Sequence, residues 1–332
     1  MKALMLEQKG PVESHPLVEK DVKIPDPQAE EVLVRITACG VCRTDLHVVE
    51  GDLPDGLNPV IPGHQVAGVV EKLGSGCIER RIGDRVGVAW LHKTCQQCEF
   101  CLTGRENLCP RSLYTGYTRH GGYAEYITAP EKFVYLLPES FSDIEATPLL
   151  CAGIIGYRAL KRSALPRGGS LAIYGFGSSA HVTIQIAQYW GARVFVATRG
   201  EKHRRFAREL GAVWVGEAGD LPPEPVDSAI VFAPAGELVP PALRALKKGG
   251  TAALAGIHMS DIPALNYEQC LFHEKNLCSV ESNTRQDGRE LLEIAAAIPI
   301  RPSVTTFPLG EANQVLERLK RDGFDGTAVL VP

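Results

Sequence analysis

The sequence predicts an α/β protein in which a doubly wound parallel sheet is combined with a separate β-rich domain. The chain has 332 residues, which is more than one hydrophobic core usually serves. Residues 1 to about 148 contain short β-branched runs between Pro and Gly turns, a pattern that indicates a distorted barrel. After about residue 166, strand-like and helix-like segments alternate, as in a parallel sheet with helices on both faces.

The first half is predicted to consist of strands joined by long loops. Short β-branched runs occupy residues 31–37 and 65–71, and residues 83–87 form a turn that leads into another strand. Residues 1–7 resemble an opening strand rather than a signal peptide, because a charge ends their apolar run after four residues. The longest mostly apolar stretch, residues 148–160, is too short to span a bilayer. We therefore expect a cytoplasmic protein with no membrane partner.

The second half is predicted to alternate strands with helices. Residues 171–174 form a buried-type strand, and Val182, Ile186 and Tyr189 share one face of the helix that follows. Phe206, Ala207 and Leu210 mark the next helix. The other predicted strands are residues 193–197, 227–232, 251–255 and 327–331, and the other predicted helices are residues 239–247, about 286–298 and about 310–322.

A glycine-rich loop follows the strand at residues 171–174. Its residues fit the pattern G-x-G-x-x-[GA], and the positions concerned are Gly175, Gly177, Ser178, Ser179 and Ala180. Glycine permits the tight turn and lets a pyrophosphate approach the free N–H groups at the helix N-terminus. Such a loop can also be purely structural, but its strand–loop–helix–strand setting favours a Rossmann dinucleotide-binding domain.

The end of the next strand bears on the choice of dinucleotide. An acid about twenty residues after the loop would bind the ribose hydroxyls of NAD. The sequence has Thr198 and Arg199 there instead, and a guanidinium suits the 2′-phosphate of NADP. Alternatively, Arg199 belongs to a solvated helix start together with Lys202, Arg204 and Arg205. We predict that Thr198 and Arg199 bind the cofactor and favour NADP(H) over NAD(H).

Four cysteines lie within one short segment: Cys95, Cys98, Cys101 and Cys109. Four thiolates at this spacing satisfy a closed tetrahedral zinc site without help from elsewhere. Clustered cysteines in a chain with no export signal are more often metal ligands than disulfides. A nucleic-acid zinc ribbon would use the same ligands, but the net charge of −4 and the lack of a flanking Lys/Arg cluster disfavour that partner. We predict a structural zinc lobe at about residues 92–112.

Three further potential ligands are dispersed along the chain. Cys42 begins a polar segment, His64 follows a Pro-Gly turn, and Cys151 lies where the two predicted domains meet. Their spacing alone does not bring them together, although ligands do tend to bind between domains. The remaining cysteines are interpreted as buried small residues: Cys39, Cys77, Cys270 and Cys278.

Taken in order, these motifs resemble the zinc-containing medium-chain alcohol dehydrogenases over essentially the whole chain. The resemblance rests on residues 39–47, 62–64, 83–86, 122–126 and 150–153, and on the cysteine and glycine loops. It implies a GroES-like β-barrel catalytic domain formed by residues 1–151 and 281–332, with a Rossmann domain formed by residues 152–280. It also implies a homo-oligomer, either a dimer or a tetramer.

The resemblance further implies two zinc ions per chain. Cys42, His64 and Cys151 would bind the catalytic zinc and leave a fourth position for water or the alcohol oxygen. Asp45 would orient His64, and Gln65 would lie close to the same site. Gln65 departs from the family, in which Glu is frequent at this position, and so removes one negative charge near the zinc.

The implied reaction is reversible hydride transfer between a primary or secondary alcohol and a nicotinamide. Thr44 would accept the alcohol proton and pass it, through the cofactor ribose, to His47. An imidazole suits this role because its unperturbed pKa, about 6.5, lies close to working pH. Arg43 would contact the cofactor. Two departures concern cofactor binding: Ser178 to Ala180 replace further glycines, and Thr327 stands about where many members have an Arg.

Three alternatives to this function remain open from the sequence. Polyol dehydrogenases and cinnamyl-type reductases share the fold and the reaction type. A nicotinamide-binding protein without zinc catalysis also shares the fold, but the complete set of Cys42, His64 and Cys151 argues against it.

Overall fold

The computed structural model describes residues 1–298 and 300–332, which divide into two compact units. The first unit comprises Met1–Cys151, Asn283–Ala297 and Arg301–Pro332, and the second comprises Ala152–Ser282 together with Ile298 and Ile300. The first contains a largely antiparallel sheet and the second a parallel one. The predicted fold class is therefore confirmed. None of the helices in the described ranges combines the length and apolar character that crossing a bilayer requires.

The first unit is built on a seven-stranded sheet. Its strands are β3 (Glu31–Val41), β4 (Gln65–Leu73), β5 (Arg85–Val88), β8 (Tyr126–Pro130), β9 (Val134–Leu136), β16 (Val304–Pro308) and β17 (Thr327–Val331). The hydrogen-bonded order is β16-β17-β3-β4-β5-β9, with β8 paired to β3. Among the described residues, strand pairing does not close this path into the predicted barrel. The order places the late strand β17 beside β3, where Val329 pairs with Gly40.

Shorter elements complete the first unit. Two small antiparallel sheets consist of β1 (Lys2–Leu6) with β2 (Leu17–Asp21), and of β6 (Leu91–Lys93) with β7 (Leu113–Tyr114). The helices are α1 (Arg43–Glu50), α2 (Glu99–Leu102), α3 (Asp143–Ala146), α9 (Arg285–Ala297) and α10 (Ala312–Lys320). Helix α1 follows directly after β3, so the sheet determines where this helix begins.

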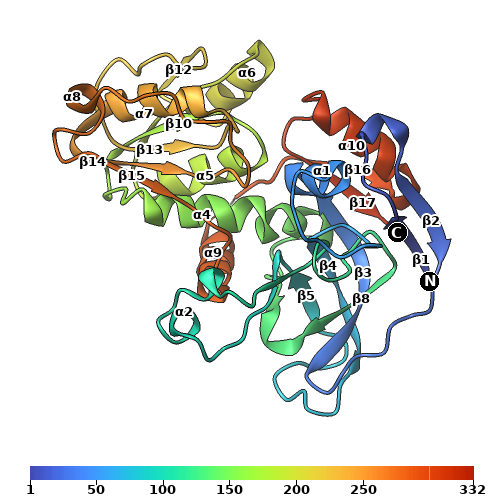
Figure 1. The fold of residues 1–332 in the computed structure, drawn as a ribbon. Helices are drawn as coiled ribbons and strands as arrows, with labels where there is room; N and C mark the ends of the chain where they lie inside the picture. The colour runs from blue at the N-terminus through green and yellow to red at the C-terminus, as the bar shows by residue number, and fades with distance from the viewer. Residues whose placement is uncertain (299) are drawn as a thin grey trace. The chain divides into compact units, whose positions relative to one another are not determined.

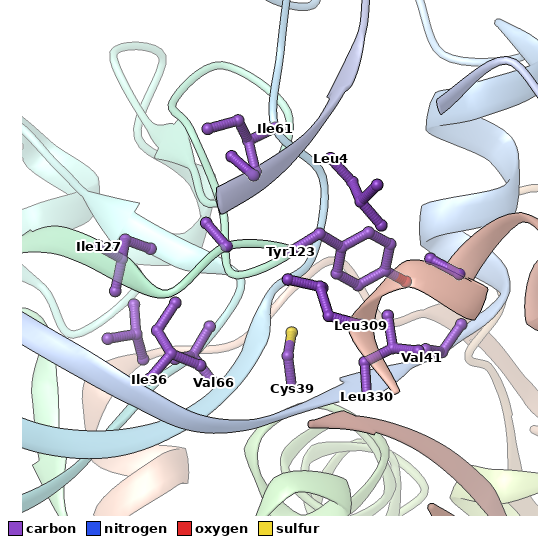
Figure 2. Close-up of a cluster of buried hydrophobic side chains, with 14 of the residues drawn as sticks. Leu4, Ile36, Cys39, Val41, Ile61, Val66, Tyr123, Ile127, Leu309 and Leu330 are labelled. Carbon is purple, nitrogen blue, oxygen red and sulfur yellow. The ribbon is translucent and has the colours of Figure 1, made fainter. Parts of the chain in front are cut away.

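The core of the first unit surrounds Tyr123, which is fully buried. Figure 2 shows Tyr123 within a cluster of buried apolar side chains that come from several strands. They include Leu4 of β1, Ile36 and Cys39 of β3, Val66 of β4, and Leu330 of β17. Burying one such Leu or Ile side chain contributes about 1.5–3 kcal/mol. The core therefore fixes the positions of β3 and β4. Strand β3 ends directly before Cys42, and β4 begins directly after His64.

The second unit contains a six-stranded sheet in which every pairing is parallel. Its strands are β10 (Ser170–Tyr174), β11 (Arg193–Ala197), β12 (Trp214–Gly216), β13 (Val226–Val231), β14 (Leu246–Leu254) and β15 (Asn276–Ser279). Their spatial order is β12-β11-β10-β13-β14-β15. Counted within this unit, that order is 3-2-1-4-5-6, which is the order of a dinucleotide-binding Rossmann sheet.

Helices cover both faces of the parallel sheet. They are α4 (Ala152–Arg162), α5 (Ser178–Tyr189), α6 (Glu201–Glu209), α7 (Val239–Ala245) and α8 (Tyr267–Cys270). Helices α4 and α5 pack against each other on one face, and α7 lies on the other (Figure 1). The reversal of strand order between β10 and β13 leaves their carboxyl ends as the expected ligand-binding edge.

Several details differ from the sequence predictions. Helix α7 ends at Ala245 rather than at residue 247, because Leu246 takes an extended conformation and begins β14. Of the three residues predicted to share one face of α5, Val182 and Ile186 are fully buried, whereas Tyr189, the last residue of the helix, is 56% exposed. Cys39 and Cys270 are buried as predicted, whereas Cys77 and Cys278 are only half-buried.

A buried histidine makes the stability of the second unit depend on pH. His181 in α5 is fully buried, and its ring lies 5.8 Å from that of Phe206. Burial lowers the pKa of His181 from its ordinary 6.5 to about 4. Between pH 4 and pH 6.5, His181 therefore binds a proton in the unfolded chain but not in the folded protein. Stability therefore falls as the pH drops through this window, by about 3 kcal/mol in total.

We expect His181→Leu to reduce the acid sensitivity of the protein. Between pH 7 and pH 5, the wild-type unfolding free energy should fall by about 2 kcal/mol more than that of the variant. Urea unfolding of both proteins at the two pH values measures this difference. An equal fall in the two proteins would contradict the assignment.

Candidate functional site

Helix α1 gathers polar side chains around a potential metal ligand. Cys42 is the N-cap of α1, and its sulfur accepts a hydrogen bond from the Thr44 N–H at 3.3 Å. The Asp45 carboxylate accepts from the Cys42 N–H at 2.9 Å, which completes a capping box. Asp45 is buried, whereas Thr44 and His47 are only half-buried and lie three residues apart, on one side of the helix.

His64 is held against α1 by a turn that requires glycine. Gly63 has a φ of +94°, and a Cβ at this position would come within 2.4 Å of the Tyr123 ring. The His64 Nε2 atom lies 3.2 Å from the Cys42 sulfur, and its Nδ1 atom lies 2.9 Å from an oxygen of Asp45. The Gly63 N–H donates to the same oxygen at 3.2 Å. Because a carboxylate only accepts, Nδ1 carries the proton and Nε2 is available as a ligand.

Cys151 joins this pair to form a compact donor set. The ligand atoms of Cys42, His64 and Cys151 all lie within 4.8 Å of one another. In a tetrahedral zinc site a thiolate and an imidazole nitrogen are separated by about 3.5 Å, which agrees with the observed 3.2 Å. Three ligands of this kind leave one position open, as catalytic zinc sites do. All three residues belong to the first unit.

The electrostatics of the cluster favour a metal-binding thiolate. A hydrogen bond from Cys151 lowers the pKa of Cys42 well below its ordinary value, and the nearby His64 adds to this shift. Burial alone would lower the pKa of His64, but Asp45 and Cys42 raise it overall to well above its ordinary value. Burial raises the pKa of Asp45, against the hydrogen bonds that it accepts. The thiolate is the form of cysteine that binds metal.

Aromatic rings lie beside the donor set. Trp90 meets His64 edge-on at a centroid distance of 5.1 Å. Tyr114 and Tyr117 stack on Trp90 at 5.0 and 5.8 Å. No local feature of the sequence marks these two tyrosines, because the β6–β7 pairing that brings their segment to Trp90 joins residues twenty or more positions apart.

Gln65 occupies an unusual environment next to His64. Its side chain is fully buried, and neither its amide oxygen nor its amide nitrogen has a hydrogen-bond partner among the described residues. Gly40 on β3 pairs with it, and a Cβ on Gly40 would lie only 3.1 Å from the Gln65 side chain. An unsatisfied buried amide costs about 1–3 kcal/mol, so this position is unfavourable unless the amide finds a further partner.

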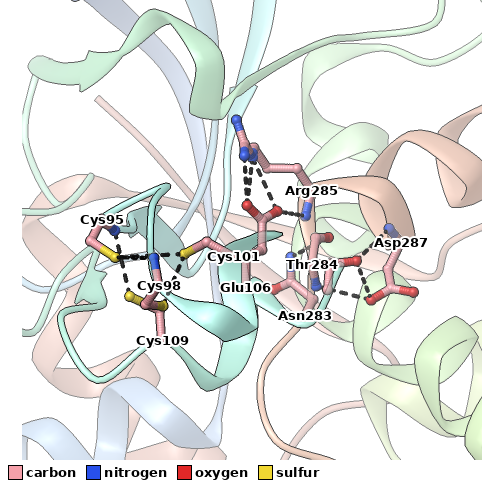
Figure 3. A network of polar contacts seen from close by, with 9 residues as sticks. All are labelled: Cys95, Cys98, Cys101, Glu106, Cys109, Asn283, Thr284, Arg285 and Asp287. Atoms are coloured by element: carbon pink, nitrogen blue, oxygen red, sulfur yellow. Dashed lines mark hydrogen bonds and ion pairs between the residues drawn. The ribbon is translucent and has the colours of Figure 1, made fainter. Parts of the chain in front are cut away.

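The four clustered cysteines form a second donor set, shown in Figure 3. The sulfur of Cys101 lies 3.9 Å from that of Cys95 and 3.6 Å from that of Cys98. The edge of a tetrahedral zinc–tetrathiolate site is about 3.8 Å, so these separations fit zinc. The Gln97 N–H lowers the pKa of Cys95 to about 6, which favours the thiolate. Further N–H groups donate to sulfur, including that of Arg111 to Cys109 at 3.4 Å.

An ion pair anchors the cysteine lobe to the start of α9. Glu106, between the third and fourth cysteines, accepts from the Arg285 guanidinium at 2.6–3.0 Å and from its backbone N–H at 2.7 Å (Figure 3). Arg285 also covers the ring of Phe133 at 4.4 Å. Both residues lie in the first unit but 179 positions apart. This pair could not be predicted from the sequence, because nothing local marks either residue.

The glycine loop in the second unit has the shape that a phosphate requires. Gly175 has a φ of +88°, and a Cβ there would meet Ala233 at 2.9 Å. Gly177 is the N-cap of α5, and a Cβ there would meet nothing within 4 Å, so open space lies before the helix. Ser178 and Ser179 form the first turn, and Ala180 is buried beneath them. The loop lies at the switch point between β10 and β13.

The residues expected at the cofactor are distributed over both units. Thr198 is buried and Arg199 is exposed, directly after β11. In the part of the chain that the structure describes, no carboxylate pairs with Arg199. The neighbouring cations do have partners: Arg204 pairs with Glu201 and Glu217, and Arg205 pairs with Glu209. In the first unit, Arg43 pairs with Asp322, and Thr327 is buried in β17.

Comparisons with known proteins agree along the whole chain. The family model described as "Alcohol dehydrogenase GroES-like domain" matches residues 28–139, and that described as "Zinc-binding dehydrogenase" matches residues 179–297. The chain is 50% identical over 338 residues to a probable alcohol dehydrogenase of Mycobacterium tuberculosis (strain CDC 1551 / Oshkosh), covering 100% of this chain and 97% of that protein. It is 38% identical over 323 residues to an alcohol dehydrogenase of Geobacillus stearothermophilus, covering 94% of each. The structure matches that of an alcohol dehydrogenase from Aeropyrum pernix with a TM-score of 0.87, at 28% identity and full coverage of both chains.

Replacing Asp45 by Asn should weaken zinc binding at the Cys42–His64–Cys151 cluster. The amide still fits, but it removes the charge that fixes His64, and changes of this kind cost about 10–100-fold in metal affinity. Competition with a chromogenic chelator measures the affinity. Asp55→Asn serves as a control at an exposed carboxylate outside the cluster. Unchanged zinc affinity in the Asp45 variant would contradict the orienting role.

Proposed function

This chain belongs to the zinc-containing medium-chain alcohol dehydrogenase family, and on that premise we propose how its own residues carry out the reaction. The protein is an NAD(P)-dependent alcohol dehydrogenase that interconverts a primary or secondary alcohol with the corresponding aldehyde or ketone. The observation that carries the assignment of residues is the buried cluster of Cys42, His64 and Cys151, whose ligand atoms converge within 4.8 Å.

We assign one zinc ion to this cluster and a second to the four cysteines. When bound, the first zinc supplies a Lewis acid that stabilises negative charge on the substrate oxygen, and the nicotinamide accepts the hydride. Cys42, His64 and Cys151 hold the metal, and Asp45 keeps the Nε2 atom of His64 directed at it. The second zinc would cross-link the lobe that Glu106 anchors to α9.

The proton of the alcohol leaves along the half-buried side of α1. Thr44, two residues after the ligand Cys42, accepts that proton at its hydroxyl and releases its own. His47 lies three residues further on, and its side chain is 14% exposed, so an imidazole there exchanges protons with water. Support for this path comes from α1, on which Thr44 and His47 lie three residues apart and are half-buried, whereas Leu46, Val48 and Val49 are buried.

The second unit binds the dinucleotide in this proposal. The pyrophosphate lies against the Gly175–Ala180 loop, where open space before α5 and the helix N-terminus favour an anion. Thr198 and Arg199 follow the second strand of the Rossmann order, where the adenosine ribose is recognised. Since Arg204 and Arg205 are already paired with glutamates, Arg199 is the cation of this group that suits a 2′-phosphate. NADP(H) is therefore the proposed cofactor.

Arg43 is also assigned to the cofactor, and it would exchange its ion pair with Asp322 for a phosphate. The proposal includes a homo-oligomer and a cytoplasmic location. Both are taken from the sequence and from the family resemblance.

Turnover tests the proposed function directly. Short primary and secondary alcohols, a polyol and cinnamyl alcohol are offered with NAD or NADP, and absorbance at the reduced-nicotinamide band is followed. We expect two zinc ions per chain, and loss of turnover when a chelator removes the ion held by Cys42, His64 and Cys151. Activity that persists after the zinc at Cys42, His64 and Cys151 has been removed would contradict the mechanism.

Arg199→Ala tests the choice of cofactor. Loss of a charged hydrogen bond to the 2′-phosphate should raise the KM for NADP at least about tenfold and leave the KM for NAD nearly unchanged. The matched control is Arg205→Ala, which removes a neighbouring cation that is paired with Glu209. Equal effects of Arg199→Ala on both cofactors would exclude recognition of the 2′-phosphate by Arg199.

A further inference from the structure

We infer that Asp52 is a positioning residue that holds His47 in the tautomer needed to receive the alcohol proton. The inference rests on the proposed function, because it concerns the same proton path. Its starting observation is a hydrogen bond of 2.8 Å between the Nδ1 atom of His47 and the Oδ2 atom of Asp52. Neither the motifs of the sequence nor the family resemblance singled out Asp52.

The turn after α1 directs Asp52 back onto His47. Gly51 closes the helix with a φ of +87°, a left-handed conformation that favours glycine. The N–H groups of both Gly51 and Asp52 donate to the His47 carbonyl at 3.0 Å. The backbone carbonyl of His47 therefore holds the backbone of Asp52, and the Asp52 carboxylate in turn contacts the His47 imidazole.

Lys9 fixes the same turn from outside the helix. Its ammonium group donates to the Leu53 carbonyl at 3.2 Å. Its aliphatic part lies against Gly51, where an added Cβ would come within 3.2 Å of it. Lys9 thus holds Gly51 and Leu53, the residues on either side of Asp52. The contact between Asp52 and His47 therefore does not depend on their side chains alone.

The chemistry of this contact selects one tautomer. An ionised carboxylate only accepts hydrogen bonds, so the His47 Nδ1 atom must carry a proton to make the bond. In neutral His47 the lone pair then resides on Nε2, which becomes the atom that receives a proton. When it does so, both ring nitrogens carry hydrogen and Asp52 faces the imidazolium. The proton is subsequently released from Nε2 to water, which restores the starting tautomer.

A second histidine–carboxylate pair shows what an ordinary surface contact looks like in this chain. His15 meets Glu317 at 3.3 Å through Nε2, and the His15 side chain is 43% exposed. The His47 contact is shorter, uses Nδ1 and involves a side chain that is only 14% exposed. Because Asp52 itself is 42% exposed, water screens its charge. Selection of the tautomer is therefore its main contribution.

The nitrogen-15 resonances of His47 report the tautomer without reference to activity. In the whole protein, labelled at histidine and assigned through His47→Gln, we expect the Nδ1–H form. Asp52→Ala should shift the ring towards the Nε2–H form, whereas Asp52→Asn, which retains an acceptor oxygen, should keep more of the Nδ1–H form. Asp55→Ala, at an exposed carboxylate of the same loop, should leave the spectrum unchanged. An unchanged tautomer in Asp52→Ala would overturn the inference.

Turnover then separates the inference from the proposed function. Asp52→Ala should lower kcat about tenfold with little change in KM, Asp52→Glu should restore part of the loss, and Asp52→Ala should have no further effect in a His47→Ala background. If His47→Ala lowers kcat and Asp52→Ala does not, the inference fails and the proton path stands. If His47→Ala leaves kcat unchanged, the proton path itself fails and the inference with it. Should Asp52→Ala not fold, the Asn and Glu variants supply the same comparisons.

Discussion

The carboxylate of Asp45 is the group on which the candidate metal site depends. It is 1% exposed and accepts hydrogen bonds from the N–H groups of Cys42 and Gly63 and from the ring of His64. A buried charge is tolerated only when it is fully hydrogen-bonded, and these partners come from two segments that the sequence separates by nineteen positions. One side chain thereby starts helix α1, closes the turn at Gly63 and orients a metal ligand.

The candidate dinucleotide site in the second unit depends on the course of the backbone rather than on a buried charge. The parallel order of its strands brings the carboxyl ends of β10 and β13 together, and Gly175 lies where an added Cβ would come within 2.9 Å of Ala233. In the loop that follows, Ser178 and Ser179 form the first turn of α5. Arg199 directly follows β11, the second strand of the Rossmann order, which is why we propose that it binds near the adenosine ribose.

How much the sequence could predict depended on whether a feature was local. The four cysteines of the lobe and the glycine loop are defined by neighbours in sequence, and the structure brings the four sulfurs together and places the loop between β10 and α5 as expected. Cys42, His64 and Cys151 could be grouped only through the family resemblance, because strand pairing and buried packing unite them. The stacking of Tyr114 on Trp90 and the pair of Glu106 with Arg285 had no local signal at all. Asp52 had a weak one, since a glycine after a helix often turns the chain back.

The pairing of β17 with β3 has a consequence for the synthesis of the chain. Residues 327–331 complete the sheet beside Cys39 to Val41, yet they emerge from the ribosome only after the entire second unit. The second unit is nearly continuous in sequence and can fold while translation proceeds. Until β17 arrives, the edge of β3 at Cys39 to Val41 stays open for pairing with another chain, because β8 covers only residues 31–35. The nascent protein is therefore exposed to aggregation at the end of the strand that leads to Cys42, and chaperones that shield strand edges would act there.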